Sequence, residues 1–173
     1  MMRFAFSGFS ILHASMLACF LVFACAAWQP ASAAAGAFSA FPGSWDGTGK
    51  IRIGDKTERI RCKATYSTRG STGSDIVLAL VCASDSYKFD LSGEFQSDEN
   101  NRIHGIWSEQ SRGVNGTASG STRGDRFQIH VESAPFSGNV TIVTRGSSQS
   151  VNIDTIGTED RISAIITLHR GLR

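Results

Sequence analysis

In the stretch Arg59-Ile60-Arg61-Cys62-Lys63-Ala64-Thr65-Tyr66, polar and apolar residues alternate with the period of a strand that buries one face. The same alternation runs through Asp75-Ile76-Val77-Leu78-Ala79-Leu80-Val81-Cys82. Residues 67–74, between the two stretches, are rich in serine, threonine and glycine, which favour turns. The sequence therefore predicts a β-hairpin folded near Thr72. Its predicted facing pairs are Cys62–Cys82, Ala64–Leu80 and Tyr66–Leu78.

The two cysteines of this hairpin are predicted to form a disulfide. Facing strands bring Cα atoms within the roughly 7 Å that the bond requires. The chain has four cysteines, and Cys19 and Cys25 lie in an apolar leader. Cys62 and Cys82 are then the one pair left in an exported chain, where such a pair is usually structural. The alternative is two buried free thiols.

The first 33 residues are predicted to be a secretory signal peptide. Arg3 gives a positive start, residues 11–27 are almost entirely apolar, and Ala31-Ser32-Ala33 offers an A-x-A cleavage site. Residues 34–42 then form an N-terminal arm and residues 43–173 the folded domain, without a transmembrane segment. A periplasmic or secreted location follows. The alternatives are a retained membrane anchor and a lipoprotein attached through Cys25.

Alternation interrupted by turns continues to the end of the chain, and no stretch has the pattern of an amphipathic helix. The predicted fold is all-β: an antiparallel up-and-down meander of about ten strands, closed into a barrel because closure removes two exposed edges. The alternative is a two-layer sandwich. Further predicted facing pairs are Leu91–Trp107, Val131–Val140, Ile142–Ile153 and Ile153–Ala164.

One predicted strand, residues 113–120, has small residues where its neighbours have bulky ones. Glycine inside a strand often marks a bend or the close approach of another group. This strand therefore indicates a barrel corner or a strand that faces Trp107 and Phe127. The alternative is room for a ligand beside it.

No motif of catalysis or metal binding stands out. His104, His130 and His169 lie in the polar phase of their strands, and none has the spacing of a metal-binding pair such as H-E-x-x-H. No G-x-S-x-G sequence is present. The acidic residues fall mostly at predicted turns, which favour them for conformational reasons. We therefore expect a protein that is not an enzyme and that uses no cofactor or metal.

The charge balance argues against a nucleic-acid partner. The chain has 17 basic and 15 acidic residues, a formal net charge of +2, and Arg3 belongs to the leader. The basic residues are spread along the sequence rather than clustered, and a nucleic-acid-binding domain usually carries a basic patch.

The domain begins Phe41-Pro42-Gly43-Ser44-Trp45, and Gly43-Ser44-Trp45 resembles the G-x-W opening of the calycin barrels: lipocalins, fatty-acid-binding proteins and avidins. In that superfamily the tryptophan closes one end of the barrel, and an arginine near the last strand packs across it. The resemblance implies these barrel-closing roles for Trp45 and Arg170. The chain departs from the pattern in having no helix after the last strand and no helical lid.

The chain also partly resembles the small periplasmic inhibitors of bacterial metalloproteases. They too begin with a G-x-W barrel strand and carry one disulfide early in the domain, and the order Trp45, Cys62, Cys82 is similar. That resemblance implies that the arm, residues 34–42, inserts into a protease cleft.

The functional hypothesis is an exported binding protein that holds a small apolar or amphipathic ligand inside the barrel. One alternative is a protein-binding module such as a protease inhibitor, and another is an envelope-associated barrel with a filled core. A membrane-spanning barrel is disfavoured because charged strand positions would have to line its lumen. The residues that share the inward phase, and are candidates to line a cavity, are Tyr66, Leu78, Tyr87, Phe89, Leu91, Phe95, Trp107, Phe127 and Ile129.

Overall fold

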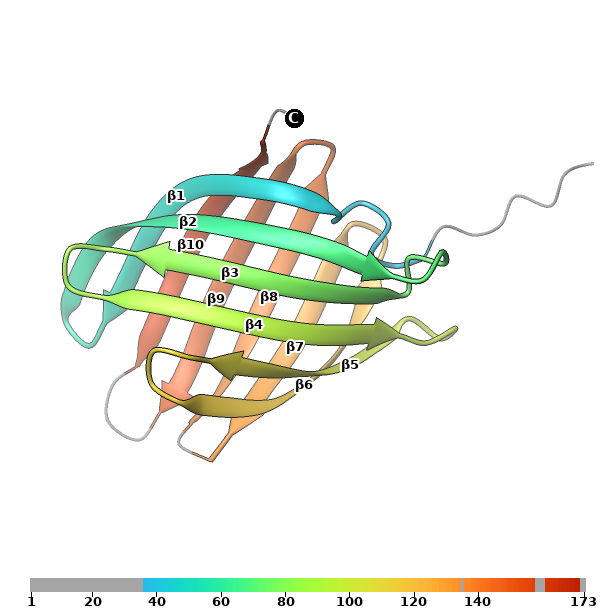
Figure 1. The fold of residues 1–173 in the computed structure, drawn as a ribbon. Helices are drawn as coiled ribbons and strands as arrows, with labels where there is room; N and C mark the ends of the chain where they lie inside the picture. Colours follow the sequence, from blue (N-terminus) through green and yellow to red (C-terminus); the bar gives the residue numbers. More distant parts are fainter. Residues whose placement is uncertain (1–35, 135, 158–160, 172–173) are drawn as a thin grey trace, which may run out of the picture. The chain divides into compact units, whose positions relative to one another are not determined.

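Ten antiparallel strands form a closed barrel in the part of the chain that the structure describes (Figure 1). This computed structural model describes residues 36–134, 136–157 and 161–171, and the predicted signal peptide lies outside them. The strands are β1 (Gly43–Ile53), β2 (Lys56–Arg69), β3 (Asp75–Ala83), β4 (Lys88–Ser97), β5 (Arg102–Glu109), β6 (Val114–Arg123), β7 (Arg126–Ser133), β8 (Phe136–Arg145), β9 (Ser148–Gly157) and β10 (Ile162–Arg170).

Pairing of the first strand with the last closes the sheet. Each strand pairs with its neighbours in the sequence, and β1 also pairs with β10 from Trp45–Arg170 to Ile53–Ile162. No sheet edge remains exposed along the meander, which removes the hazard of edge-to-edge association. The predicted all-β barrel is confirmed, and the two-layer sandwich is not formed. Among the described residues, no helix has the length and apolar character needed to cross a membrane.

The β2–β3 hairpin has the predicted register. Cys62 faces Cys82, and the two are joined by the predicted disulfide with a Cα–Cα distance of 4.1 Å. The other two predicted pairs of this hairpin, Ala64–Leu80 and Tyr66–Leu78, are also confirmed. All six side chains point into the barrel, because residues two apart on a strand share a face.

Three other predicted pairs are wrong, each by two residues on one strand. Trp107 faces Gly93 instead of Leu91, Val140 faces Ile129 instead of Val131, and Ile153 faces Val140 instead of Ile142. The predicted Ile153–Ala164 pair is confirmed.

Turn length explains two of these shifts, those between β8 and β9 and between β4 and β5. The β8–β9 turn contains only Gly146 and Ser147, with Gly146 at φ 57°, and Arg145 already faces Ser148. In the β4–β5 turn, the Asp98 carboxylate accepts hydrogen bonds from the N–H groups of Asn100 and Arg102, at 2.8 Å each. A shift of two residues leaves every side chain on its predicted face, because the strand period is two.

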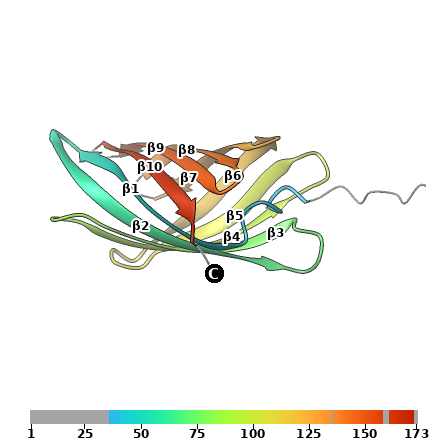
Figure 2. The same cartoon turned by 90° about the horizontal axis from the view of Figure 1, so that it is seen from above.

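Two glycine-bearing strands, β1 and β6, form the corners of the barrel. A Cβ atom at Gly47 would lie 1.9 Å from the carbonyl oxygen of Thr167, and one at Gly116 would lie 1.9 Å from that of Glu132. Backbone of the next strand thus occupies the place of a side chain. For residues 113–120, the corner interpretation is therefore correct. Strands β2–β5 form one wall between the corners, and β7–β10 form the other (Figure 2).

The disulfide is expected to contribute measurably to the free energy of unfolding. It closes a loop between residues 20 apart, which corresponds to about 3 kcal/mol of loop-closure entropy. We expect the paired variant C62S/C82S to lose roughly that amount in the free energy of urea unfolding. A melting temperature that is the same for the oxidised and the reduced wild type would contradict this expectation.

Candidate ligand-binding cavity

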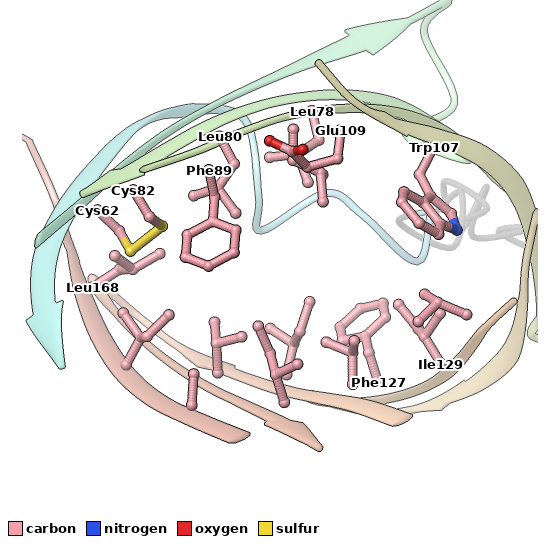
Figure 3. A pocket seen from close by; sticks show the side chains of 18 of the residues that line it. Cys62, Leu78, Leu80, Cys82, Phe89, Trp107, Glu109, Phe127, Ile129 and Leu168 are labelled. Atoms are coloured by element: carbon pink, nitrogen blue, oxygen red, sulfur yellow. A yellow bond between two sulfur atoms is a disulfide. The ribbon is translucent and has the colours of Figure 1, made fainter. Parts of the chain in front are cut away.

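The barrel interior holds an apolar cavity of about 270 Å³ between the two walls (Figure 3). In Figure 3, Leu80 and Phe89 approach it from one wall, and Phe127 and Ile129 from the other. Many inward side chains, Leu78 and Ile129 among them, are apolar but only half-buried. They pack against the core on one side and border the void on the other, so the inward face does not fill the barrel.

Most of the predicted cavity residues lie where the strand phase placed them. The structure places eight of the nine around the cavity: Tyr66, Leu78, Phe89, Leu91, Phe95, Trp107, Phe127 and Ile129.

Tyr87 is the exception, and its predicted place in the cavity is wrong. It belongs to the β3–β4 turn, before β4 begins at Lys88, and it is half-exposed. Three hydrogen bonds between Ser84 and Tyr87 fix the turn. Ser84 N–H donates to the Tyr87 carbonyl (2.8 Å), Tyr87 N–H donates to Ser84 Oγ (3.1 Å), and the Ser84 hydroxyl donates to the Tyr87 carbonyl (3.4 Å). These bonds hold Tyr87 beyond the rim of the barrel.

The N-terminal arm plugs one end of the cavity, which we call the plugged end. Phe38 and Phe41 are each 3% exposed, and both line the cavity. The Phe41 ring centroid lies 4.7 Å from that of Phe127 and 5.2 Å from that of Tyr66, both edge to face. Phe38 stacks on Phe127 at 5.7 Å. Neither phenylalanine was predicted to line the cavity, because both precede the first strand and follow no strand period.

Backbone hydrogen bonds fasten the same arm to the β2–β3 loop. Gly36 N–H donates to the Thr72 carbonyl at 3.1 Å, and Phe38 N–H donates to the Gly73 carbonyl at 3.0 Å. A Cβ atom at Gly36 would lie 2.2 Å from the Thr72 carbonyl oxygen, so only glycine allows this approach. The described part of the arm is therefore integrated with the barrel.

Trp45 and Arg170 hold the plug in place. The Arg170 guanidinium carbon lies 4.4 Å from the centre of the Trp45 ring, which is fully buried. Arg170 donates hydrogen bonds to the carbonyls of Ala40 and Pro42. Trp45 Nε1–H donates to the carbonyl of Phe41 at 2.7 Å. The pair implied by the calycin resemblance thus binds three consecutive carbonyls of the arm.

A buried polar network lies beside the plug. The Tyr66 hydroxyl donates to Gln149 Oε1 at 3.0 Å, and Gln149 Nε2–H donates to Thr144 Oγ1 at 3.0 Å. Gln149 is fully buried. Burial raises the pKa of Tyr66, and the bond to Gln149 only partly offsets this, so the phenol stays neutral.

Two ionisable groups, Glu109 and Arg112, line the opposite end of the cavity. The Glu109 carboxylate accepts hydrogen bonds from the N–H groups of Asp90 (2.9 Å), Ser111 (3.2 Å) and Arg112 (2.8 Å). Burial raises the pKa of Glu109, but these hydrogen bonds outweigh it, and the net pKa lies below its usual value. Glu109 therefore stays ionised and fixes the β5–β6 turn.

Arg112 reaches from the surface into the cavity lining. Its guanidinium nitrogen lies 3.6 Å from Glu109, its guanidinium carbon lies 4.6 Å from the centre of the Phe89 ring, and its side chain is 44% exposed. A residue that lines the cavity and is also in solvent marks where the cavity reaches the surface. We call this the Arg112 end.

The cavity lining is mostly apolar. Its ionisable side chains are Tyr66, Glu109 and Arg112, and every other lining residue is apolar, a disulfide cysteine or Thr155. Within the described ranges, no cluster of histidine, cysteine, aspartate or glutamate could hold a metal ion. The three described histidines are exposed on the outside of the barrel.

Two solved structures share this barrel. The S-type phycobiliprotein lyase CPES from Guillardia theta has a TM-score of 0.63 at 11% identity, over 79% of this chain and 91% of its own. Rv2717c from M. tuberculosis has a TM-score of 0.60 at 14% identity, over 78% and 94%. These two likenesses show that this chain shares its fold with both proteins. No protein-family model matches the chain, and no curated protein matches it by sequence.

Removing the guanidinium of Arg170 should loosen the plug. R170Q loses the ring contact with Trp45 and two charge-assisted hydrogen bonds, and we expect it to lower the free energy of unfolding by about 2–3 kcal/mol. Tryptophan emission should shift to the red as Trp45 becomes hydrated. The matched control is R123Q, an exposed arginine in β6, which should change stability by less than about 0.5 kcal/mol. Equal losses in the free energy of unfolding for R170Q and R123Q would contradict the role of Arg170 in holding the plug.

The lowered pKa of Glu109 predicts a dependence of stability on pH. Because its pKa is depressed in the folded state, its contribution is present above the unfolded pKa and is lost as the pH falls through the folded pKa. We expect E109Q to be less stable than wild type by about 1–3 kcal/mol at pH 7, with a gap that shrinks toward pH 3. The control is E132Q, at an exposed position of β7. A pH-independent gap for E109Q would count against this assignment.

Proposed function

We propose that this protein is an exported, non-enzymatic binding protein that carries a small apolar or amphipathic ligand inside its barrel. The observation that supports this most directly is the apolar cavity of about 270 Å³. A void of this size in an apolar core costs on the order of several kcal/mol of stability. Water does not fill such a space well, because it needs polar partners. An apolar ligand recovers those contacts.

The two ends of the cavity favour an amphipathic ligand in one orientation. The plugged end offers the rings of Phe38, Phe41 and Phe127, which suit the apolar body of a ligand. The other end offers the guanidinium of Arg112, which suits a polar group that remains partly in water. The cavity volume lies near the lower limit of ordinary ligand pockets, which are about 300–1,000 Å³, so a small ligand is favoured.

One structural neighbour suggests an alternative function, that of an enzyme. The name of the Guillardia theta protein describes an enzyme, a phycobiliprotein lyase, and such a role for this chain would need a group able to move a proton. The carboxylate in the lining, Glu109, is already engaged by three backbone N–H groups. Because these hydrogen bonds already occupy the Glu109 carboxylate, they support a binding function over a catalytic one.

The position of the arm bears on the protease-inhibitor alternative. An inhibitor that inserts its N-terminal segment into a protease cleft needs that segment free. Here Phe38 and Phe41 are buried in the barrel, and Arg170 holds the carbonyls of Ala40 and Pro42. The arrangement supports the ligand carrier.

The proposed location is the periplasm or the exterior of the cell. The signal-peptide pattern of residues 1–33 supports export. The Cys62–Cys82 disulfide supports an oxidising compartment, because such bonds are rare in a reducing cytosol.

Filling the cavity from one wall should abolish ligand binding. Leu80 lines the cavity, whereas its neighbour Val81 points outward and is 42% exposed. We expect L80W to weaken binding of the neutral fluorophore N-phenyl-1-naphthylamine by at least about tenfold, because the indole occupies the void. V81W adds the same side chain outside and should bind as wild type does.

Fluorescence titration measures this difference, and native mass spectrometry of protein isolated from its host would reveal a bound small molecule. Absence of fluorophore binding by wild type, together with a bare protein mass, would refute the carrier function. Equal weakening by L80W and V81W would place the binding site outside the barrel.

A further inference from the structure

Five basic side chains stand together on the outside of β1 and β2. The strand period puts Lys50 and Arg52 on the outer face of β1, and the same period puts three more on the outer face of β2. Lys50 lies directly opposite Arg59, and all five are exposed. We call this set the basic stripe: Lys50, Arg52, Arg59, Arg61 and Lys63. The prediction that the positive charge is spread out rather than clustered is therefore wrong for these residues.

The stripe lacks the ion pairs that other arginines have. Arg69 pairs with Glu94, Arg145 with Asp125 and Arg161 with Asp154, at 2.6–2.8 Å. Within the described residues, no member of the stripe forms an ion pair at 4.0 Å or less. Two carboxylates lie nearby: Asp46 stands opposite Lys63, and Arg52 contributes to the lowered pKa of Asp154.

Like charges on facing positions of a sheet repel each other, so the Lys50–Arg59 pair is unfavourable for the isolated barrel. Residues two apart on a strand are about 7 Å apart, and adjacent strands about 5 Å. The five charges therefore act together over a Debye length of about 10 Å at 0.1 M salt. An anionic surface would relieve this repulsion.

Exposed apolar side chains adjoin the stripe on both sides. Ile165 of β10 lies opposite Lys50 and is 64% exposed, and Val81 of β3 lies opposite Lys63 and is 42% exposed. Cations beside exposed apolar residues suit the boundary between lipid headgroups and acyl chains. A nucleic acid would satisfy the charges but would offer its phosphate backbone, not an apolar surface, to Ile165.

We propose that the outer face of β1 and β2 docks on a membrane surface that contains anionic lipid. The basic stripe contacts the headgroups, and Ile165 and Val81 enter the interface beside it. In Figure 1 the two strands lie along the near side of the barrel, where no other described element covers them. This docking is independent of whether the cavity holds a ligand.

Co-sedimentation with vesicles tests the docking. We expect the wild-type protein to bind vesicles of phosphatidylglycerol and phosphatidylcholine at low salt, with little binding to phosphatidylcholine alone and a loss of binding at high salt. Each cation near an anionic surface contributes enough that the triple variant K50Q/R59Q/R61Q should bind roughly 100-fold more weakly.

A control variant removes the same charge elsewhere. R102Q/R123Q/R126Q replaces three exposed arginines near the plugged end, and it should keep most of the binding. Circular dichroism and fluorophore binding by both variants should match wild type, which separates docking from folding and from the cavity.

The predicted contact of Ile165 with the membrane is tested by a matched pair of variants. I165S should bind the mixed vesicles several-fold more weakly, whereas I106S, at an equally exposed isoleucine of β5 (61%), should not. The proposal is overturned by any of three results: no vesicle binding at low salt, equal losses in the two triple variants, or capture by heparin or DNA without capture by vesicles.

Discussion

This barrel depends on closure of the sheet and on closure of one end of its interior, and the guanidinium of Arg170 takes part in both. Its strand, β10, pairs with β1, and its side chain covers Trp45 at the start of β1. From that position it also binds the carbonyls of Ala40 and Pro42. Arg170 is half-buried, and a partly desolvated cation needs such acceptors. The arm supplies these carbonyls, and Arg170 in turn holds the arm in place.

The interior stays hollow because of the way the walls meet. Gly47 and Gly116 let β1 and β6 bend close to their neighbours, and each wall between them is a sheet of four strands. The side chains of each wall are not long enough to fill the space to the other. Polar groups are confined to the two ends, where Gln149 and Glu109 have their hydrogen bonds satisfied.

The sequence was sufficient for the fold wherever strand period and turn chemistry agreed. The Cys62–Cys82 register followed because alternation on both strands left one arrangement with apolar faces together. The two-residue turn at Gly146 was misplaced, since alternation fixes the face and not the turn length. Phe38 and Phe41 lie outside any periodic pattern, and the clustering of Lys50 with Arg59 becomes visible only once the strands are paired.

The pairing of the first strand with the last also sets the order in which the molecule can assemble. Every other strand pair is a hairpin or a short connection and can form locally, whereas Trp45 must wait for Arg170. Closing so long a loop costs chain entropy before any contact rewards it, which makes it a late step. Until β10 has been synthesised, the meander has two open edges and an unplugged interior. The cavity is therefore the last feature of the protein to form, and the ligand proposed for it would enter the finished barrel rather than bind the growing chain.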